Sequence, residues 1–259
     1  MPSNEVYPNP TVTNVIFQIR FPNLFSIENK IGDYQITVME KFPKSALLFR
    51  RQVVFADVGP QVKFEEFPNE MTQQGPKIWQ FVSPDKVTLN VLSDSLDINS
   101  AFHKTYNNPG HENRFRDTIQ FAVDNFLKIT KIPVLNRIGL RYIDDCPIPA
   151  KDNKSFGDYY NTTFDIERFN FANASEMEFK TVVKRDEYFL RYAESFAEID
   201  GKRKYILDFD AFANDINASD YLKTTDKLHD IIIDEYQKTI KDPVRDYMRK
   251  PKDMTGGTA

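Results

Sequence analysis

The beginning of the chain carries two different spacings of hydrophobic residues. Over 15–21 they fall at every second position, which is the period of a β-strand, and Pro22 follows directly. Over 27–42 they recur at steps of three and four residues, which predicts a helix with one apolar face that stops before Pro43. The sequence therefore predicts a strand followed by a helix.

Similar patterns continue along the rest of the chain. Strand-like runs lie at 46–56, 62–67, 77–83, 86–92, 96–102, 136–143, 177–183, 188–196 and 204–209, and helical patterns lie at 111–130 and from Ser219 to Met248. Pro84 and Asp85 predict a tight turn, and Gly201 is expected in a longer loop. The segment 156–171 is rich in aromatic residues but has no period, so it receives no assignment.

Short strings of the first half are echoed in the second. The string 82–91 resembles 183–192, and the string 96–102 resembles 207–212, with a separation that grows by about ten residues. We therefore predict an internally duplicated α+β protein with halves at 7–133 and 134–250 and a flexible tail at 251–259. Each half is expected to form an antiparallel meander sheet with a long packed helix, and the two sheets are expected to lie edge to edge or face to face, with a ligand cleft between the halves. Leu89 should then correspond to Leu190, and Phe126 to Tyr236.

Composition narrows the class of protein. The chain has 259 residues, of which 41% are hydrophobic, and its net charge of −4 does not favour a protein that coats nucleic acid. Its single cysteine, Cys146, excludes internal disulfides. Neither a signal peptide nor a membrane-spanning run is recognisable, so we expect a cytoplasmic protein that binds no membrane. A protein partner is also expected.

No sequence motif with a known catalytic mechanism is present. Among the histidines, His103 and His111 flank one loop and, with Asp97, are candidates for a metal site, although loop histidines are more often simply solvated. His229 is expected to be a half-buried structural residue. No cofactor is expected.

A second candidate site comprises Asp165, Glu178 and Lys180. Glu178 and Lys180 share one face of a predicted strand, an arrangement that metal-dependent nucleases use to hold a cation and polarise a water molecule. The simpler interpretation is the solvent-exposed face of a strand. A metal-dependent nuclease or nucleotide-processing enzyme that needs a divalent cation is therefore the alternative function.

Two further features predict contacts between the halves. Asp97 and Asp208 occupy equivalent places in the repeat, where they either cap turns or meet at a shared cleft. Arg141 and Tyr142 lie in the most distinctive string, 137–143. An arginine within a strand must meet a carboxylate or a ligand anion, so Arg141 is expected to be mostly buried against Asp97 or Asp208.

The opening string 7–12, together with the string 137–143, resembles an uncharacterised prokaryotic family described chiefly as sporadically distributed. This chain has Thr11 where that pattern has a second proline, and Asp144 where it has asparagine. The resemblance brings no established catalytic residues. It implies a non-catalytic binding or regulatory component of a multi-protein prokaryotic system, of which antiviral or other genome defence is one example.

Overall fold

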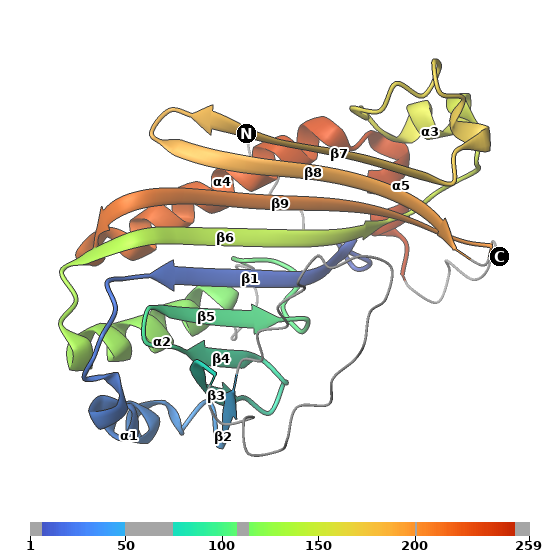
Figure 1. The fold of residues 1–259 in the computed structure, drawn as a ribbon. Coiled ribbons are helices and arrows are strands. Elements are labelled where there is room, and N and C mark those ends of the chain that lie inside the picture. Colours follow the sequence, from blue (N-terminus) through green and yellow to red (C-terminus); the bar gives the residue numbers. More distant parts are fainter. Residues whose placement is uncertain (1–6, 50–74, 108–113, 200, 252–259) are drawn as a thin grey trace, which may run out of the picture.

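The computed structural model describes residues 7–49, 75–107, 114–199 and 201–251. Most of the tail and the strand predicted at 62–67 lie outside these ranges. In chain order, the elements are β1 (Val12–Arg20), α1 (Ile27–Val38), β2 (Lys44–Phe49), β3 (Lys77–Val82), β4 (Thr88–Val91), β5 (Ser95–Ser100), α2 (Phe115–Thr130), β6 (Val134–Cys146), α3 (Asn153–Tyr159), η2 (Phe171–Asn173), β7 (Glu176–Arg185), β8 (Tyr188–Ile199), β9 (Lys202–Asn217), η3 (Ala218–Asp220), α4 (Tyr221–Thr239) and α5 (Asp242–Arg249) (Figure 1).

The described strands form one antiparallel sheet of nine strands, in the order β2-β3-β4-β5-β1-β6-β9-β8-β7. The two predicted meanders are present as β3–β5 and β7–β9, and the fold is α+β. They do not form separate sheets, because β1 pairs with β6 and places Phe17 opposite Leu140. This ladder joins the halves directly, and the ligand cleft expected between them stays a prediction.

The two faces of the sheet differ in what covers them. In Figure 1 the helices α1, α2 and α4 lie behind the sheet, and we call this covered side the helical face. Residues such as Phe17, Ile98 and Leu140 point to it and have no exposed surface. Their strand neighbours alternate to the other side, which no described helix covers and which we call the open face.

Aromatic residues fill the core on the helical face. The hydroxyl of Tyr34 on α1 donates to the carbonyl of Ala122 on α2 at 3.0 Å, and its ring meets that of Phe126 edge-on at 5.3 Å. On the other half, Tyr236 of α4 packs edge-on against Phe209 of β9 at 6.1 Å. Each meander is therefore followed by a helix that packs back onto the helical face.

The last helix is broken, which corrects the prediction of one helix from Ser219 to Met248. The backbone leaves the helical conformation at Ile240, and α5 begins at Asp242 with a proline in its first turn. Pro243 has no N–H to donate, and its ring would clash with the carbonyl four residues earlier, at Thr239. Proline is tolerated only in the first turn of a helix, so the chain starts a new one.

The aromatic segment left unassigned forms α3, η2 and a connecting loop. Phe156 stacks on Phe171 at 4.2 Å and meets Tyr205 of β9 edge-on at 5.0 Å. Beneath this cap, the fully buried carboxylate of Glu194 accepts hydrogen bonds from five groups, which are the hydroxyls of Thr162, Thr163, Tyr192 and Tyr205 and the backbone N–H of Thr163. The cap is thus fixed to the sheet by polar contacts as well as by ring packing.

Gly201 does not lie in a long loop. It has a φ of 72°, a left-handed conformation that favours glycine, and it lies between the end of β8 at Ile199 and the start of β9 at Lys202. Because β8 and β9 are also much longer than β4 and β5, the additional residues of the second half extend the strands rather than a loop.

Candidate functional site: a charged ladder on the open face

Five charged side chains from three adjacent strands form a continuous row on the open face. We call this row the arginine–aspartate ladder, and its members are Arg137 and Arg141 of β6, Arg191 of β8, and Asp208 and Asp210 of β9. Asp210 lies directly opposite Arg141 on β6 and directly opposite Arg191 on β8. The ladder therefore exists because β6 pairs in this register with β9, which is distant in sequence, and β9 pairs with its sequence neighbour β8.

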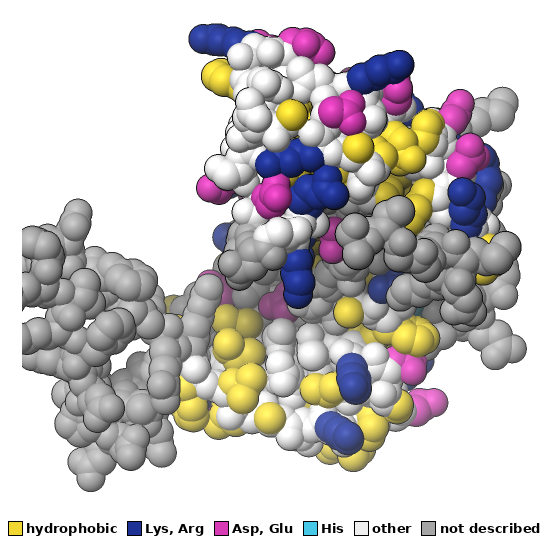
Figure 2. All heavy atoms as spheres, turned by 90° about the vertical axis from the view of Figure 1, so that its right-hand side faces the viewer, with side chains coloured by type: hydrophobic (Ala, Val, Ile, Leu, Met, Phe, Trp, Pro, Cys, Tyr) yellow, Lys and Arg dark blue, Asp and Glu magenta, His cyan; other side chains and the backbone are white. Residues whose placement is uncertain are grey.

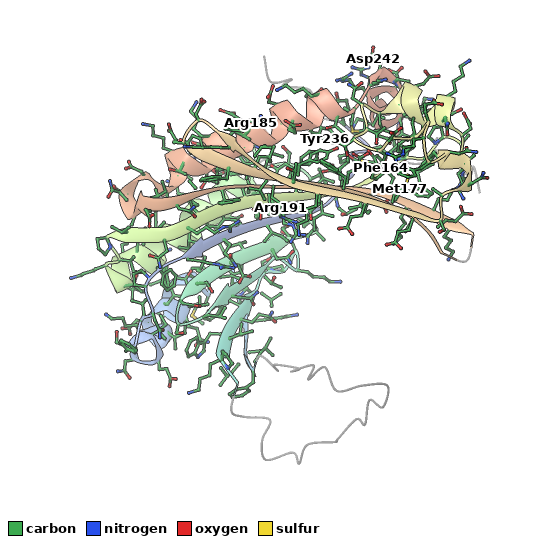
Figure 3. All side chains as sticks on the ribbon, turned by 45° about the horizontal axis from the view of Figure 1, so that its top comes forward. Phe164, Met177, Arg185, Arg191, Tyr236 and Asp242 are labelled. Carbon is green, nitrogen blue, oxygen red and sulfur yellow. The ribbon has the colours of Figure 1, made fainter. Side chains whose placement is uncertain are left out.

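Asp208 holds two arginines. Arg141 donates from Nε and Nη2 to its two carboxylate oxygens at 2.7 and 2.6 Å, which is the bidentate geometry of the strongest ion pairs. Arg191 donates to the same carboxylate at 3.2 and 3.1 Å, and its Nε lies 3.5 Å from Asp210. Figure 3 shows Arg191 among the side chains of the sheet.

Arg137 completes the row. Its Nη2 donates to both carboxylate oxygens of Asp210 at 3.0 Å, and its guanidinium lies 4.7 Å from the centre of the Phe212 ring. A Cβ on Gly139 would lie 2.5 Å from Nη1 of Arg137. Because residue 139 is a glycine, the Arg137 side chain has room to extend over it along the same strand and reach Asp210. Phe212 in turn stacks on Phe189 at 5.2 Å.

The ladder is partly desolvated and carries excess positive charge. The side chains of Asp208 and Asp210 are 14% and 18% exposed, whereas that of Arg141 is 37% exposed. The hydrogen bond from Arg141 to Asp208 raises the pKa of Arg141 above its usual range. Arginine stays protonated at neutral pH, so Arg141 offers fixed donors and a fixed positive charge.

The expected partner of Arg141 was one of two carboxylates, and the structure places it on Asp208. Arg141 is half-buried rather than mostly buried. Asp97 lies elsewhere on the open face, on β5, where it accepts a hydrogen bond from Asn90 at 2.9 Å, and Asn90 accepts one from Gln80 at 3.0 Å. Since β1 and β6 lie between β5 and β9, Asp97 and Asp208 are separated by about 14 Å across the strands at the usual strand spacing, and by a further four residues along them. They do not meet, and the shared-cleft expectation was wrong.

Tyr142 lies on the opposite face from Arg141, because adjacent strand residues point to opposite sides. Its buried hydroxyl is 3.1 Å from Nδ1 of His229 on α4, and the His229 ring packs on Tyr106 at 4.9 Å. Asp226 links this cluster to α2, because it accepts from Tyr106 at 2.7 Å and from Arg116 at 2.8 and 2.9 Å. Burial lowers the pKa of His229 to about 4, so this histidine is neutral at physiological pH.

The predicted metal candidates do not converge. His103 is buried on the helical face, where Nδ1 is 2.8 Å from Oγ of Ser100 and the ring packs against Phe115, whereas Asp97 is on the open face. His111 lies outside the described residues. Within the described ranges, no three His, Cys, Asp or Glu side chains are grouped so that they could hold a metal ion.

The three residues of the alternative catalytic site do not lie on the same face of the sheet. Glu178 and Lys180 project from the open face of β7, since the intervening Phe179 lies opposite the buried Glu194. Asp165 belongs to the cap on the helical face and accepts a local hydrogen bond from the N–H of Arg168 at 3.0 Å. The described positions therefore offer no shared cation site to these three residues.

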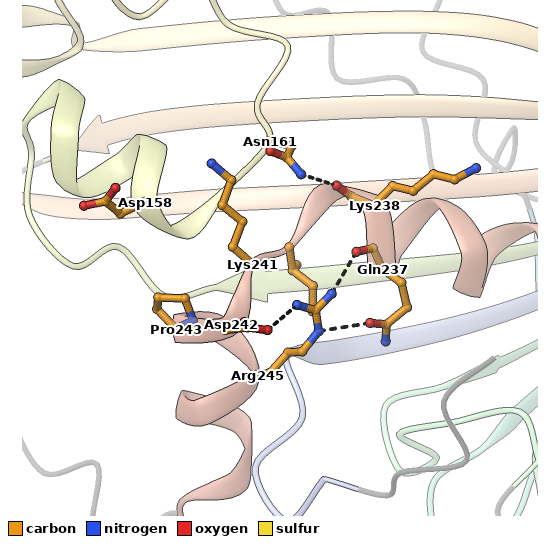
Figure 4. Close-up of a pocket in the computed structure, with 9 residues that line it drawn as sticks. Asp158, Asn161, Gln237, Lys238, Lys241, Asp242, Pro243 and Arg245 are labelled. Atoms are coloured by element: carbon orange, nitrogen blue, oxygen red, sulfur yellow. Dashed lines mark hydrogen bonds and ion pairs between the residues drawn. The ribbon is translucent and has the colours of Figure 1, made fainter. Parts of the chain in front are cut away.

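A shallow groove of about 670 Å³ lies where α4, α5 and the end of α3 meet (Figure 4). Its cations are bound within the chain. Arg245 donates to the carbonyl of Gln237 at 2.9 Å and to Asp242 at 2.8 Å, and Nζ of Lys241 donates to the carbonyl of Gly157 at 2.5 Å. We assign no ligand to this groove.

Comparison with known proteins adds no family to this picture. A scan against protein-family models, a search of curated proteins and a search of solved structures each found no significant match. None of the helices in the described part of the chain is long and apolar enough to cross a membrane.

Sequence reasoning missed three members of the ladder, namely Arg137, Arg191 and Asp210. A signal for two of them was available. Arg191 stands between Leu190 and Tyr192 in a predicted strand, and Asp210 follows Asp208 at the two-residue period of one strand face. Which strand brings each arginine to which aspartate depends on long-range pairing that the sequence pattern does not contain.

Proposed function

We propose that this protein is a non-catalytic binding component that recognises a protein partner on the open face of its sheet. The observation that carries the proposal is the arginine–aspartate ladder, a preorganised and partly desolvated row of charges on a face that no described helix covers. The residue sets considered for catalysis do not converge in the described structure. We therefore do not extend the proposal to a metal-dependent nuclease or nucleotide-processing enzyme.

The charges of the ladder favour a protein over a nucleic acid. Two carboxylates stand between the three arginines, so a phosphate backbone laid along the row would meet repulsion at alternate positions. A protein surface with acidic and basic groups in alternation complements such a row. On the side of the molecule shown in Figure 2, cationic and acidic side chains are likewise interspersed and form no broad patch of one sign.

The wider role is part of the same proposal. We infer a regulatory or binding function within a multi-protein prokaryotic system such as genome defence, supported by the resemblance of strings 7–12 and 137–143 to a sporadically distributed family. We also infer that the halves are copies of one unit. In support, Leu89 and Leu190 are both buried in the middle strands of their meanders, and Phe126 and Tyr236 are both buried on the helices that follow.

The test is capture of the partner from the native host, followed by mapping of the contact. Wild-type protein should retain one stoichiometric protein partner, and hydrogen exchange should slow in β6, β8 and β9 of the complex. Arg141→Gln removes the most exposed charge of the ladder and should weaken capture about tenfold or more. Arg168→Gln, an exposed arginine on the cap, is the matched control and should leave capture unchanged.

Three results would count against the proposal. One is recovery of nucleic acid in place of a protein, and a second is protection confined to other elements. The third is the absence of any stoichiometric partner together with turnover of a substrate by the isolated chain. The last result would also favour the alternative function, a metal-dependent nuclease or nucleotide-processing enzyme.

A further inference from the structure

The β7 strand forms one edge of the sheet. It has ten residues and pairs only with β8 among the described strands (Figure 1). An edge of this length presents a row of backbone N–H and C=O groups that another strand can pair with. Two apolar side chains on it are also exposed, Phe179 at 38% and Val182 at 54%.

The register of β7 on β8 shows which backbone groups point outward. Beside the pair of Glu176 and Ala197, the N–H of Glu198 donates to the carbonyl of Ser175 at 2.9 Å. Hydrogen-bonded and non-hydrogen-bonded pairs alternate along an antiparallel ladder, so the odd-numbered residues of β7 bond to β8. The even-numbered residues, from Glu176 to Lys184, therefore turn their N–H and C=O groups to the free edge.

Charge is ordered along this edge, with glutamates at the start of β7 and lysines in its second part. We propose that β7 pairs antiparallel with β7 of a second copy of this chain, about a two-fold axis at Thr181. Glu178 then lies opposite the partner subunit's Lys184, and the same pair recurs on the other side of the axis. Lys180 lies opposite the partner subunit's Val182, and Phe179 lies opposite the partner subunit's Val183.

This register is selected by side-chain chemistry. A two-fold axis perpendicular to the sheet keeps both helical faces on one side, so even positions must face even positions. A shift by two residues in one direction places Lys180 opposite the partner subunit's Lys180. The opposite shift places Lys180 opposite the partner subunit's Lys184. Like charges directly across a ladder are destabilising, and of these three registers only the one centred on Thr181 avoids both contacts.

Charged residues on an edge strand usually prevent such pairing. Here the order of the charges makes the edge complementary to itself, because the acidic half of β7 in one copy meets the basic half of β7 in the other. Arg185 takes no part, because it donates to Glu235 of α4 at 3.1 Å and lies beside that helix in Figure 3. The inference concerns a different surface from the open-face ladder and does not depend on the proposed function.

The test is analytical ultracentrifugation of the full chain over a concentration series. Wild-type protein should sediment at twice the chain mass of 30.2 kDa at high concentration. Glu178→Lys or Lys184→Glu alone places like charges at both symmetric contacts and should weaken the dimer about tenfold or more. The double variant Glu178→Lys/Lys184→Glu exchanges the charges and should regain most of the lost affinity.

Lys202→Glu, an exposed lysine of β9, serves as the matched control and should dimerise like the wild type. Val182→Pro removes an outward N–H without breaking a bond to β8 and should give a folded monomer, which circular dichroism verifies. A wild type that stays monomeric throughout the series overturns the inference. So does a dimer that neither single charge reversal weakens, or a double variant no more dimeric than the single ones.

Discussion

The buried carboxyl group of Asp144 is expected to reduce stability above neutral pH, and Asp144→Asn should restore it. Asp144 is 1% exposed on the helical face, where it accepts a hydrogen bond from Thr11 at 2.8 Å. The hydroxyl of Tyr236 lies 2.6 Å from the same Thr11 oxygen. Burial, with a smaller contribution from the charge of Asp208, raises the pKa of Asp144 from 3.8 to about 7 against the lowering effect of the Thr11 hydrogen bond.

The magnitude follows from this pKa. The folded protein binds the proton more tightly than the unfolded chain, so the free energy of unfolding falls as the pH rises from about 4 to about 7. At about 1.36 kcal/mol per pKa unit, the full cost is about 4 kcal/mol above neutral pH. His229 acts with the opposite sign. Burial lowers its pKa from 6.5 to about 4, so it adds stability over nearly the same interval, by about 3 kcal/mol before screening by the solvent that reaches the ring.

The contributions of Asp144 and His229 to the free energy of unfolding therefore partly cancel between about pH 4 and about pH 7. Asparagine keeps the acceptor for Thr11 and cannot ionise. We expect Asp144→Asn to raise the free energy of unfolding by about 2–4 kcal/mol at about pH 8, and by much less at about pH 4. Stability should then rise with pH, because the His229 contribution is no longer opposed.

Urea denaturation at both pH values measures this difference. Asp158→Asn, an exposed carboxyl on α3, is the control and should change stability at neither pH. An Asp144→Asn variant that loses stability at about pH 8, or that gains the same amount at both pH values, would refute the reasoning.

Two further changes test the polar contacts of the sheet by thermal and urea denaturation. Glu194→Ala should lower the free energy of unfolding by about 3–5 kcal/mol, because it removes the acceptor of four hydroxyls and of the Thr163 N–H, while Glu167→Ala on the surface should cost almost nothing. A loss below about 1 kcal/mol would show that the cap does not depend on Glu194. Arg141→Ala should lower the free energy of unfolding by about 1 kcal/mol, because solvent reaches Arg141 and Asp208 keeps its ion pair with Arg191. Breaking a fully buried pair would cost about 3–5 kcal/mol, and a measured loss above about 3 kcal/mol would contradict this expectation.

Local periodicity was sufficient to predict most elements but not their neighbours. The strand at β1 and the helices α1 and α2 follow from the spacing of apolar residues alone. The break before α5 was also readable, since Pro243 stands inside the predicted helix. The merging of two meanders into one sheet was not, because it depends on the pairing of β1 with β6 across more than a hundred residues of chain.

For the candidate site, too, the sequence pattern was sufficient for local features but not for long-range contacts. Alternation along a strand already implies that Arg141 and Tyr142 point to opposite faces, so treating them as one contact site was avoidable. The choice of Asp208 over Asp97 as the partner of Arg141 required the strand order, which puts β9 next to β6. Repeat equivalence suggested that the two aspartates are alike. In the sheet, the two halves are related about the central strands β1 and β6, and this relation places the two aspartates on opposite sides of those strands.

The energetics of the ladder separate its contribution to stability from the role in binding that we propose for it. Partly exposed ion pairs contribute little to folding, because the cost of removing charges from water offsets their attraction. Docking of a partner would remove the remaining water from Arg141 and Asp208 after their geometry has already been fixed by their own ion pair and by Arg191, so little ordering cost would remain. The same side chain should therefore matter little for unfolding and much for capture. If Arg141→Gln unfolds the protein as strongly as it weakens capture, the ladder is a structural clasp rather than a recognition surface.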